Sequence, residues 1–283
     1  MRTFTKLLST AALALSLAAA GAGHAATVTI GNATMNGTKN NVQWIQTKTG
    51  TGINTRYGGK LITGLGSVAV AVNDKFTYNF SPADLVTAGA DLTPGTLDDG
   101  LLAKLFINAT ASTAGLGNPA SGTPGSVDQA QAGISGVMSL LLTAAHPGGC
   151  LSGTCKNLLT ANFTNAWILG GGATAHFTGF NRAASGSDPG STLVLTSDFI
   201  DFTNWSDLAF DYTLNTIHAG AGTANSTVTH VLGRSLTSFN AASSGNYSGD
   251  APAIPEPASW ALMILGFGGV GVMLRNRRRL AFA

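Results

Sequence analysis

Four aspartates around one predicted strand have the side chains best suited to acid–base chemistry. Asp198 and Asp201 lie three positions apart near the end of that strand, and Asp207 and Asp211 follow. Two carboxyl groups that face each other across a groove can hydrolyse a glycosidic bond. Aspartate also caps turns between strands, which is the commoner role. The sequence favours turn capping, and the alternative is a secreted hydrolase that acts on polysaccharide through an aspartate pair.

Other enzyme motifs are missing from the sequence. It contains neither G-x-S-x-G nor H-E-x-x-H, and its only glutamate is Glu256. Asp91, Asp98 and Asp99 could bind calcium in a loop, but their spacing fits no EF-hand. The remaining candidates are four histidines that are not spaced as metal ligands: His146, His176, His218 and His230. We therefore predict no catalytic residue, no metal site and no cofactor, and we do not expect an enzyme.

Three glycines near the C-terminus have the spacing of a dinucleotide-binding turn. Gly266, Gly268 and Gly271 spell G-x-G-x-x-G. That turn requires a preceding strand and a following acidic residue, whereas these glycines lie in an uncharged apolar run over residues 258–274. A helix of this length spans roughly 25 Å, close to the thickness of a bilayer core. Four arginines follow the run and would hold its end at the cytoplasmic face: Arg275, Arg277, Arg278 and Arg279. The run is therefore predicted to be a transmembrane helix.

The N-terminus has the three parts of a secretory signal peptide. Arg2 and Lys6 precede a short apolar stretch, which ends in small residues. This order predicts cleavage after Ala25, with cleavage after Ala26 as the near alternative. The Sec translocon and signal peptidase are the partners that such a leader implies.

The two cysteines, Cys150 and Cys155, enclose four residues. Export to an oxidising compartment favours a disulfide between them. A metal site would need more ligands than this segment offers.

The exported part of the chain is slightly acidic. Residues 27–250 contain nine basic residues and twelve aspartates. Five of the basic residues are scattered among polar ones: Lys39, Lys48, Arg56, Lys60 and Lys75. The sequence therefore predicts no basic patch and no nucleic-acid partner.

Alternation of apolar and polar residues dominates the exported part. Phe210, Tyr212 and Leu214 share one face of a predicted strand, and Leu193 and Leu195 point inward from another. The predicted strands cover residues 26–30, 42–48, 65–72, 75–80, 103–111, 158–169, 173–180, 191–202 and 208–217, with a turn at 203–207. Many short strands predict a mainly β fold, arranged as a single sandwich or jelly roll.

Two short helices are expected within this fold. Ser81–Asp84 and Ser126–Gln129 resemble capping boxes, and the second is predicted to open a helix through Ala145. The predicted organisation is a signal peptide at 1–25, an exported passenger at 26–240, a flexible linker at 241–254 and a C-terminal signal at 255–279.

The C-terminal signal resembles a known family. Pro255-Glu256-Pro257, then Trp260, the apolar run and the arginines are similar to the PEP-CTERM sorting signal of the PEPxxWA type. The resemblance implies that exosortase recognises Pro255, Glu256, Pro257 and Trp260, while the arginines anchor the tail. It further implies transient inner-membrane anchoring with a periplasmic passenger, then release or transfer to the cell surface or exterior, in bacteria that make extracellular polysaccharide.

These observations favour a non-enzymatic surface or matrix protein that contacts exopolysaccharide. Trp44, Trp167 and Trp205 could stack on sugar rings, although tryptophan more often fills a core. Trp205 lies in the predicted turn and has the best chance of exposure. Ice binding is a third hypothesis, because residues 27–29 and 227–229 both read Thr-Val-Thr, but no regular array of such steps is present.

Overall fold

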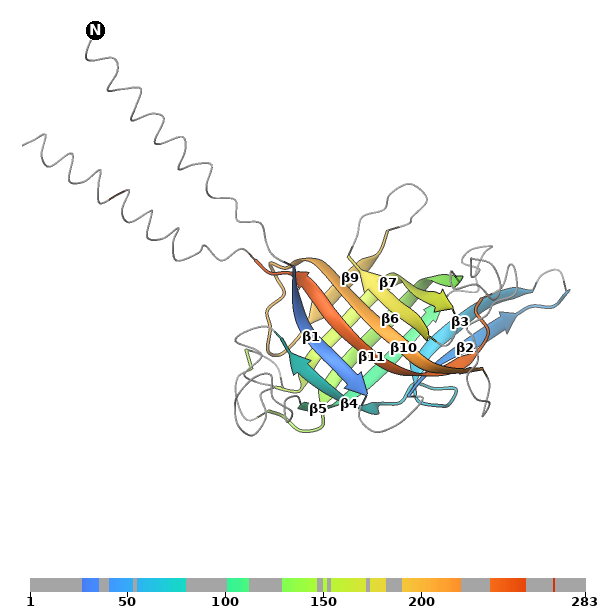
Figure 1. The fold of residues 1–283 in the computed structure, drawn as a ribbon, viewed down its shortest axis with the longest axis horizontal. Helices are drawn as coiled ribbons and strands as arrows, with labels where there is room; N and C mark the ends of the chain where they lie inside the picture. Colours follow the sequence, from blue (N-terminus) through green and yellow to red (C-terminus); the bar gives the residue numbers. More distant parts are fainter. Residues whose placement is uncertain are drawn as a thin grey trace, which may run out of the picture. The chain divides into compact units, whose positions relative to one another are not determined.

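The computed structural model describes residues 27–35, 41–52, 55–79, 101–111, 129–146, 150–151, 154–171, 174–181, 190–219, 235–252 and 267. Thr27–Asp250 forms one compact unit. Its strands are β1 (Thr27–Met35), β2 (Val42–Thr49), β3 (Arg56–Thr63), β4 (Val72–Tyr78), β5 (Leu101–Ala111), β6 (Gln129–Leu142), β7 (Asn157–Gly171), β8 (Thr174–Phe180), β9 (Thr192–Thr196), β10 (Ser206–Ala219) and β11 (Phe239–Asp250) (Figure 1).

The strands belong to one antiparallel sheet that closes on itself. The order runs β1-β4-β5-β3-β2-β11-β10-β8-β7-β6, and the pairs β1–β11 and β5–β6 close it. In Figure 1, β1, β10 and β11 cross over β5, β6 and β7, so the closed sheet has two layers. The predicted β-rich fold is confirmed, but its layers are parts of one sheet rather than the separate sheets of a sandwich.

The core lies between these layers and is filled by the inward positions of each strand. Phe210, Tyr212 and Leu214 are at most 2% exposed, and Leu193 and Leu195 are buried as well. These five inward positions match the prediction. The alternation was readable because one face of each strand packs on the core while the other meets water.

The helix predicted over residues 126–145 is wrong, because residues 129–142 form β6. Bulges on either side of Ile134 interrupt the alternation, and Gly133 adopts a φ of 70° there. The buried positions Ile134, Met138 and Leu140 are consequently four and two residues apart. A spacing of four is also the spacing of a helix face, so the bulges disguise the strand.

The predicted flexible linker is wrong over residues 241–250, which form most of β11. This strand pairs with β10 on one side and with β1 and β2 on the other. A Cβ at Gly245 would lie 2.4 Å from the ring of Tyr212. The small residues that suggested a linker therefore make room for large aromatic side chains.

Residues 65–71 do not form the predicted strand. Gly64 has a φ of 88°, and the Val70 N–H donates to the Thr63 carbonyl at 3.0 Å. The chain therefore loops back after β3, and Val72 begins β4.

Several predictions lie outside the described residues. These are the signal peptide with its cleavage site at Ala25, the helix opening at Ser81, the loop of Asp91, Asp98 and Asp99, and the C-terminal signal, of which only Phe267 is described and has helical backbone. Among the residues that the structure does describe, no helix has the length and hydropathy needed to cross a membrane.

Candidate functional site

A groove of about 640 Å³ opens between β9 and the start of β10. Within the described part of the chain, β9 pairs with β7 alone, and the β8–β10 pairing ends at Phe180 and Ala209. β9 and the first residues of β10 are therefore not joined by a strand pairing, and side chains line the space between them. The groove is lined by Leu151, Asn181, Leu193, Val194, Leu195, Thr196, Ser197, Ile200, Asp201, Phe202, Thr203 and Leu208.

An aromatic pair lies at this groove. The half-buried ring of Phe202 contacts Trp205 edge to face, with ring centroids 5.5 Å apart. The backbone N–H of Trp205 donates to the Phe202 carbonyl at 3.1 Å, which confirms the predicted turn. Trp205 itself is half-buried against the core. Trp205 therefore packs between Phe202 and the core rather than standing free in the turn.

Asp201 supplies the acidic group of the groove. Its carboxylate accepts hydrogen bonds from the Thr203 hydroxyl and from the Thr203 N–H, the latter at 2.9 Å. These bonds lower the pKa of Asp201 below its ordinary value. Asp201 is therefore ionised at neutral pH, and its remaining lone pairs can accept further hydrogen bonds.

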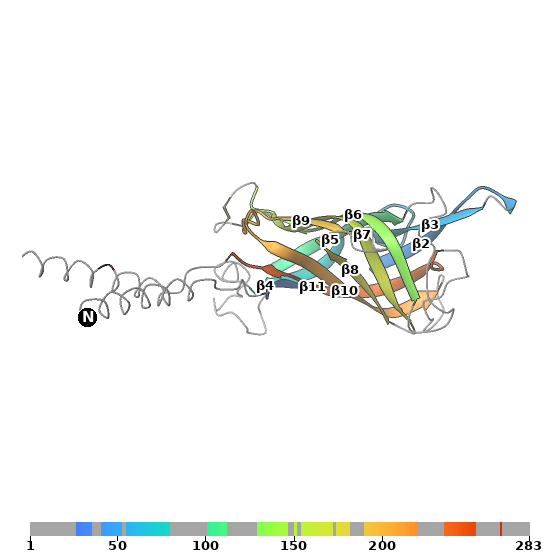
Figure 2. The same ribbon diagram turned by 90° about the horizontal axis from the view of Figure 1, so that it is seen from above.

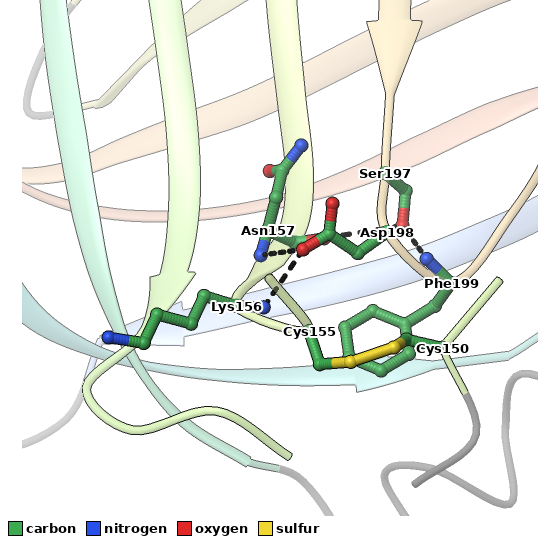
Figure 3. The surroundings of a disulfide bond; sticks show 7 residues. All are labelled: Cys150, Cys155, Lys156, Asn157, Ser197, Asp198 and Phe199. Carbon is green, nitrogen blue, oxygen red and sulfur yellow. Dashed lines mark hydrogen bonds between the residues drawn. A yellow bond between two sulfur atoms is a disulfide. The ribbon is translucent and has the colours of Figure 1, made fainter. Parts of the chain in front are cut away.

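Asp198 has a structural role beside the groove (Figure 3). Its carboxylate accepts the backbone N–H groups of Lys156 at 2.9 Å and Asn157 at 3.1 Å. Its own carbonyl accepts the Leu151 N–H at 2.7 Å. Asp198 thus ties the β9–β10 connection to the start of β7 and to the disulfide loop, so that Leu151 is held at the groove.

Ser197 fixes the same connection from the inner side. Its hydroxyl accepts the backbone N–H groups of Phe199 at 2.9 Å and Ile200 at 3.3 Å. The Tyr78 hydroxyl lies 3.0 Å from it and also donates to the Leu158 carbonyl. Burial raises the pKa of Tyr78 well above its usual range. The groove wall that includes Ser197 and Ile200 is therefore anchored to β4 and β7.

The other two aspartates lie away from the groove lining. Asp211 on β10 contacts His176 on β8, with Nδ1 3.2 Å from the carboxylate. Asp207 is exposed at the start of β10 with a φ of 47°. The structure thus brings one of the four aspartates, Asp201, into the groove, and the described residues hold no group of three His, Cys, Asp or Glu side chains that could bind a metal ion.

The remaining candidate residues are dispersed. Trp44 is fully buried and donates its Nε1–H to the Leu236 carbonyl at 3.0 Å, so it belongs to the core. Trp167 is half-buried on β7, and His146 stacks edge to face on Phe199. Of the Thr-Val-Thr steps, residues 27–29 lie on β1 and residues 227–229 lie outside the described chain.

The predicted disulfide between Cys150 and Cys155 is confirmed, with the Cα atoms 5.4 Å apart. It closes the loop that carries Leu151 to the groove. The sequence indicated the bond but not its position beside the groove. The place of the disulfide loop depends on its contact with Asp198, which lies 43 residues after Cys155 in the sequence.

We expect Cys155→Ser to lower the free energy of unfolding by at most about 2–3 kcal/mol, because the closed loop is short. Urea denaturation of the variant and of the parent, without reductant, measures the difference. The parent in excess reductant is the control and should unfold at the same urea concentration as the variant. Failure of the variant to fold at all would contradict this estimate.

Sequence reasoning missed Leu151, Asn181 and Phe202 as groove residues. They come from the β6–β7 loop, the end of β8 and the β9–β10 connection. The sequence offered one signal, which was an aromatic residue beside Asp201 directly before the predicted turn.

Comparison with known proteins identifies the C-terminal segment. Residues 253–279 match the family model of the PEP-CTERM protein-sorting motif. No curated protein and no solved structure matches the chain significantly. The match spans Pro255, Glu256, Pro257 and Trp260 together with the arginine cluster, and it agrees with the resemblance drawn from the sequence. The chain therefore carries a PEP-CTERM sorting motif, which indicates an exported protein that exosortase sorts to the cell envelope or surface.

Proposed function

We propose that this protein is a non-enzymatic component of the cell surface or extracellular matrix that binds exopolysaccharide in the β9–β10 groove. The observation that carries the proposal is the Phe202 ring, supported by Trp205, beside the ionised Asp201 in an open groove. The sorting motif supports an address at the cell envelope or surface, where an exported protein can meet exopolysaccharide.

The groove has the two kinds of contact that a sugar requires. The apolar face of a pyranose ring packs on an aromatic ring, and its hydroxyls exchange hydrogen bonds with polar side chains. Phe202 supplies the first contact, while Asn181, Asp201 and Thr203 supply the second. Because Trp205 and the core hold Phe202 in place, little side-chain freedom is lost on binding.

The positions of Asp198 and Asp201 favour binding over hydrolysis. A glycosidase places two carboxyl groups on opposite sides of the scissile bond. Among the described residues that line the groove, Asp201 is the one carboxylate, and the Asp198 carboxylate is bonded to two backbone N–H groups. The alternative of a polysaccharide hydrolase therefore receives no support from the position of the predicted aspartates.

Phe202→Ala should weaken binding of the host's exopolysaccharide about tenfold, which corresponds to about 1.4 kcal/mol. Affinity electrophoresis of the purified exported protein in gels containing the polymer measures this change. The matched control is Phe106→Ala, which truncates a half-buried phenylalanine on β5. Equal retardation of the parent and the Phe202 variant, both folded by circular dichroism, would reject the groove as the binding site.

Glu256→Ala should block maturation of the tail, because the motif places this residue at the centre of its Pro-Glu-Pro segment. A blot of membrane and medium fractions from the native host should show a longer form that is retained in the membrane. Asp250→Ala, at the end of β11, is a control that should mature normally. Identical processing of the Glu256 variant and the parent would argue against recognition through this residue.

A further inference from the structure

The hairpin of β2 and β3 extends beyond the rest of the sheet. β2 pairs with β11 only from Val42 to Trp44, and β3 pairs with β5 only from Gly59 to Ile62. Within the described residues, 47–49 and 56–58 therefore pair only with each other. Figures 1 and 2 both show this hairpin reaching away from the crossed layers. We call its described residues 45–52 and 55–60 the β2–β3 arm.

The arm carries three cationic side chains that are separated in the sequence. Register pairs Thr49 with Arg56 and Ile45 with Lys60, which places Arg56 and Lys60 on one face of the arm. Lys48 lies on the opposite face. All three side chains are exposed. The arm thus carries two cationic side chains on one face and one on the other, while the absence of a nucleic-acid partner stays a prediction.

No acidic group neutralises the arm along its own strands. Residues 27–73 contain four basic residues and no acidic one, whereas residues 74–250 contain five basic and twelve acidic ones. In the described part of the chain, the contact between a basic-type side chain and a carboxylate is that of His176 with Asp211, which lies on β8 and β10 and not on the arm. The arm is thus a local cationic segment within residues 27–250, where acidic residues outnumber basic ones.

The surroundings of the three charges indicate what kind of polyanion fits. The arm is rich in hydroxyl groups, and its large exposed side chains are charged rather than apolar. A surface that binds a lipid membrane combines basic residues with apolar ones that enter the interface. Hydroxyls instead match the hydroxyls of a sugar polymer, while ammonium and guanidinium groups match its carboxylates.

The base of the arm is fixed, so its charges keep their relative positions. The Gln46 N–H donates to the Ser238 hydroxyl at 2.9 Å, and the Gln46 side chain donates to the Ser235 carbonyl at 2.8 Å. On the other strand, the Ser235 hydroxyl donates to the Gly58 carbonyl at 2.6 Å. A rigid base reduces the entropy that binding would cost.

We propose that the β2–β3 arm binds acidic polysaccharide, a polymer of uronic acid units, through Lys48, Arg56 and Lys60. The inference shares with the proposed function the exported address and a polysaccharide ligand, but it concerns a second surface. The arm attracts the polymer by charge, whereas the groove holds a sugar ring by stacking.

The test combines Lys48→Gln, Arg56→Gln and Lys60→Gln in the exported protein and measures binding to alginate at low salt. Dissociation constants should rise roughly ten- to hundredfold, because three surface charge contacts are lost together. Raising the salt from about 20 mM to about 200 mM should weaken the parent far more than the variant. The charge-matched control combines Lys75→Gln, Lys104→Gln and Lys156→Gln, and its affinity should stay within about threefold of the parent's.

Three results would overturn the proposal. They are an equal loss in both triple variants, equal affinity of the parent for neutral dextran, and tighter binding to phosphatidylglycerol vesicles than to alginate. Thermal unfolding of each variant checks that it is folded. If the triple variant does not fold, the single variant Arg56→Gln replaces it in the test, and we expect an intermediate loss of affinity. Phe202→Ala should retain alginate affinity, so that failure of the groove and failure of the arm are distinguished.

Discussion

Asp74→Asn is expected to stabilise the folded protein by about 4 kcal/mol at pH 8 and to change its stability little at pH 4. Asp74 lies on β4 with its side chain inside the closed sheet, and it is fully buried. Within the described chain, its Oδ2 atom has no hydrogen-bond partner. Burial raises the pKa of Asp74 from 3.8 to about 7, although a hydrogen bond from the Lys75 N–H opposes the shift.

The direction follows from proton binding. Between pH 3.8 and about pH 7, the folded protein holds a proton on Asp74 that the unfolded chain has released. Stability therefore falls as the pH rises through this window, and the full loss is present above it. The groups that interact with this carboxyl electrostatically include Tyr212 on β10 and Tyr247 on β11, and burial raises the pKa of both hydroxyls, so they stay neutral across the window.

Urea unfolding of the parent and of Asp74→Asn at several pH values measures this prediction. The two stability curves should separate progressively above about pH 4 and become parallel above about pH 7. Asp207→Asn, at an exposed aspartate, is the control and should follow the parent throughout. Curves for Asp74→Asn and the parent that stay parallel at all pH values would show that Asp74 is not a buried, protonated acid.

Gly59→Ala is expected to lower the free energy of unfolding by about 3 kcal/mol or more. A Cβ at this position of β3 would lie 2.0 Å from Cζ2 of Trp44. The tryptophan cannot move away easily, because it is fully buried and its Nε1–H is bonded to the Leu236 carbonyl. Overpacking of a fixed core side chain is costly because neighbouring groups must leave their preferred rotamers.

Equilibrium unfolding in urea measures the loss, with Gly66→Ala as the matched control. At Gly66 the nearest atoms to an added Cβ lie 3.9 Å away, so the control should keep the stability of the parent. Equal stability of the two variants would mean that Trp44 does not pack against Gly59.

Sequence reasoning located several strands in which large apolar residues alternate with polar ones. The inward residues of β9, and those of β10 from Leu208 to Leu214, follow that alternation, and both strands were found. β6 was mistaken for a helix because bulges around Ile134 change the spacing of its buried residues. β11 was mistaken for a linker because it is rich in small residues. Gly245 is small because the ring of Tyr212, on another strand, occupies the space that a side chain would need.

The candidate site was less accessible to sequence reasoning. Asp198 and Asp201 were identified, and turn capping describes the bonds of Asp201 with Thr203. The groove itself depends on β9 pairing with β7 and not with β10, and no local pattern encodes that choice. Lys48 and Lys60 similarly became parts of one arm only through the register of β2 with β3, which places them on its two faces.

The central claim is that the exported protein binds its host's exopolysaccharide without cleaving it. The most direct measurement incubates the purified protein with that polymer, sediments the complex and assays reducing ends in the same sample over time. The account predicts that the protein sediments with the polymer, that Phe202→Ala releases most of it, and that reducing ends stay at the level of the polymer alone. A steady rise in reducing ends that Asp201→Asn abolishes, or a protein that stays in the supernatant, would contradict the account.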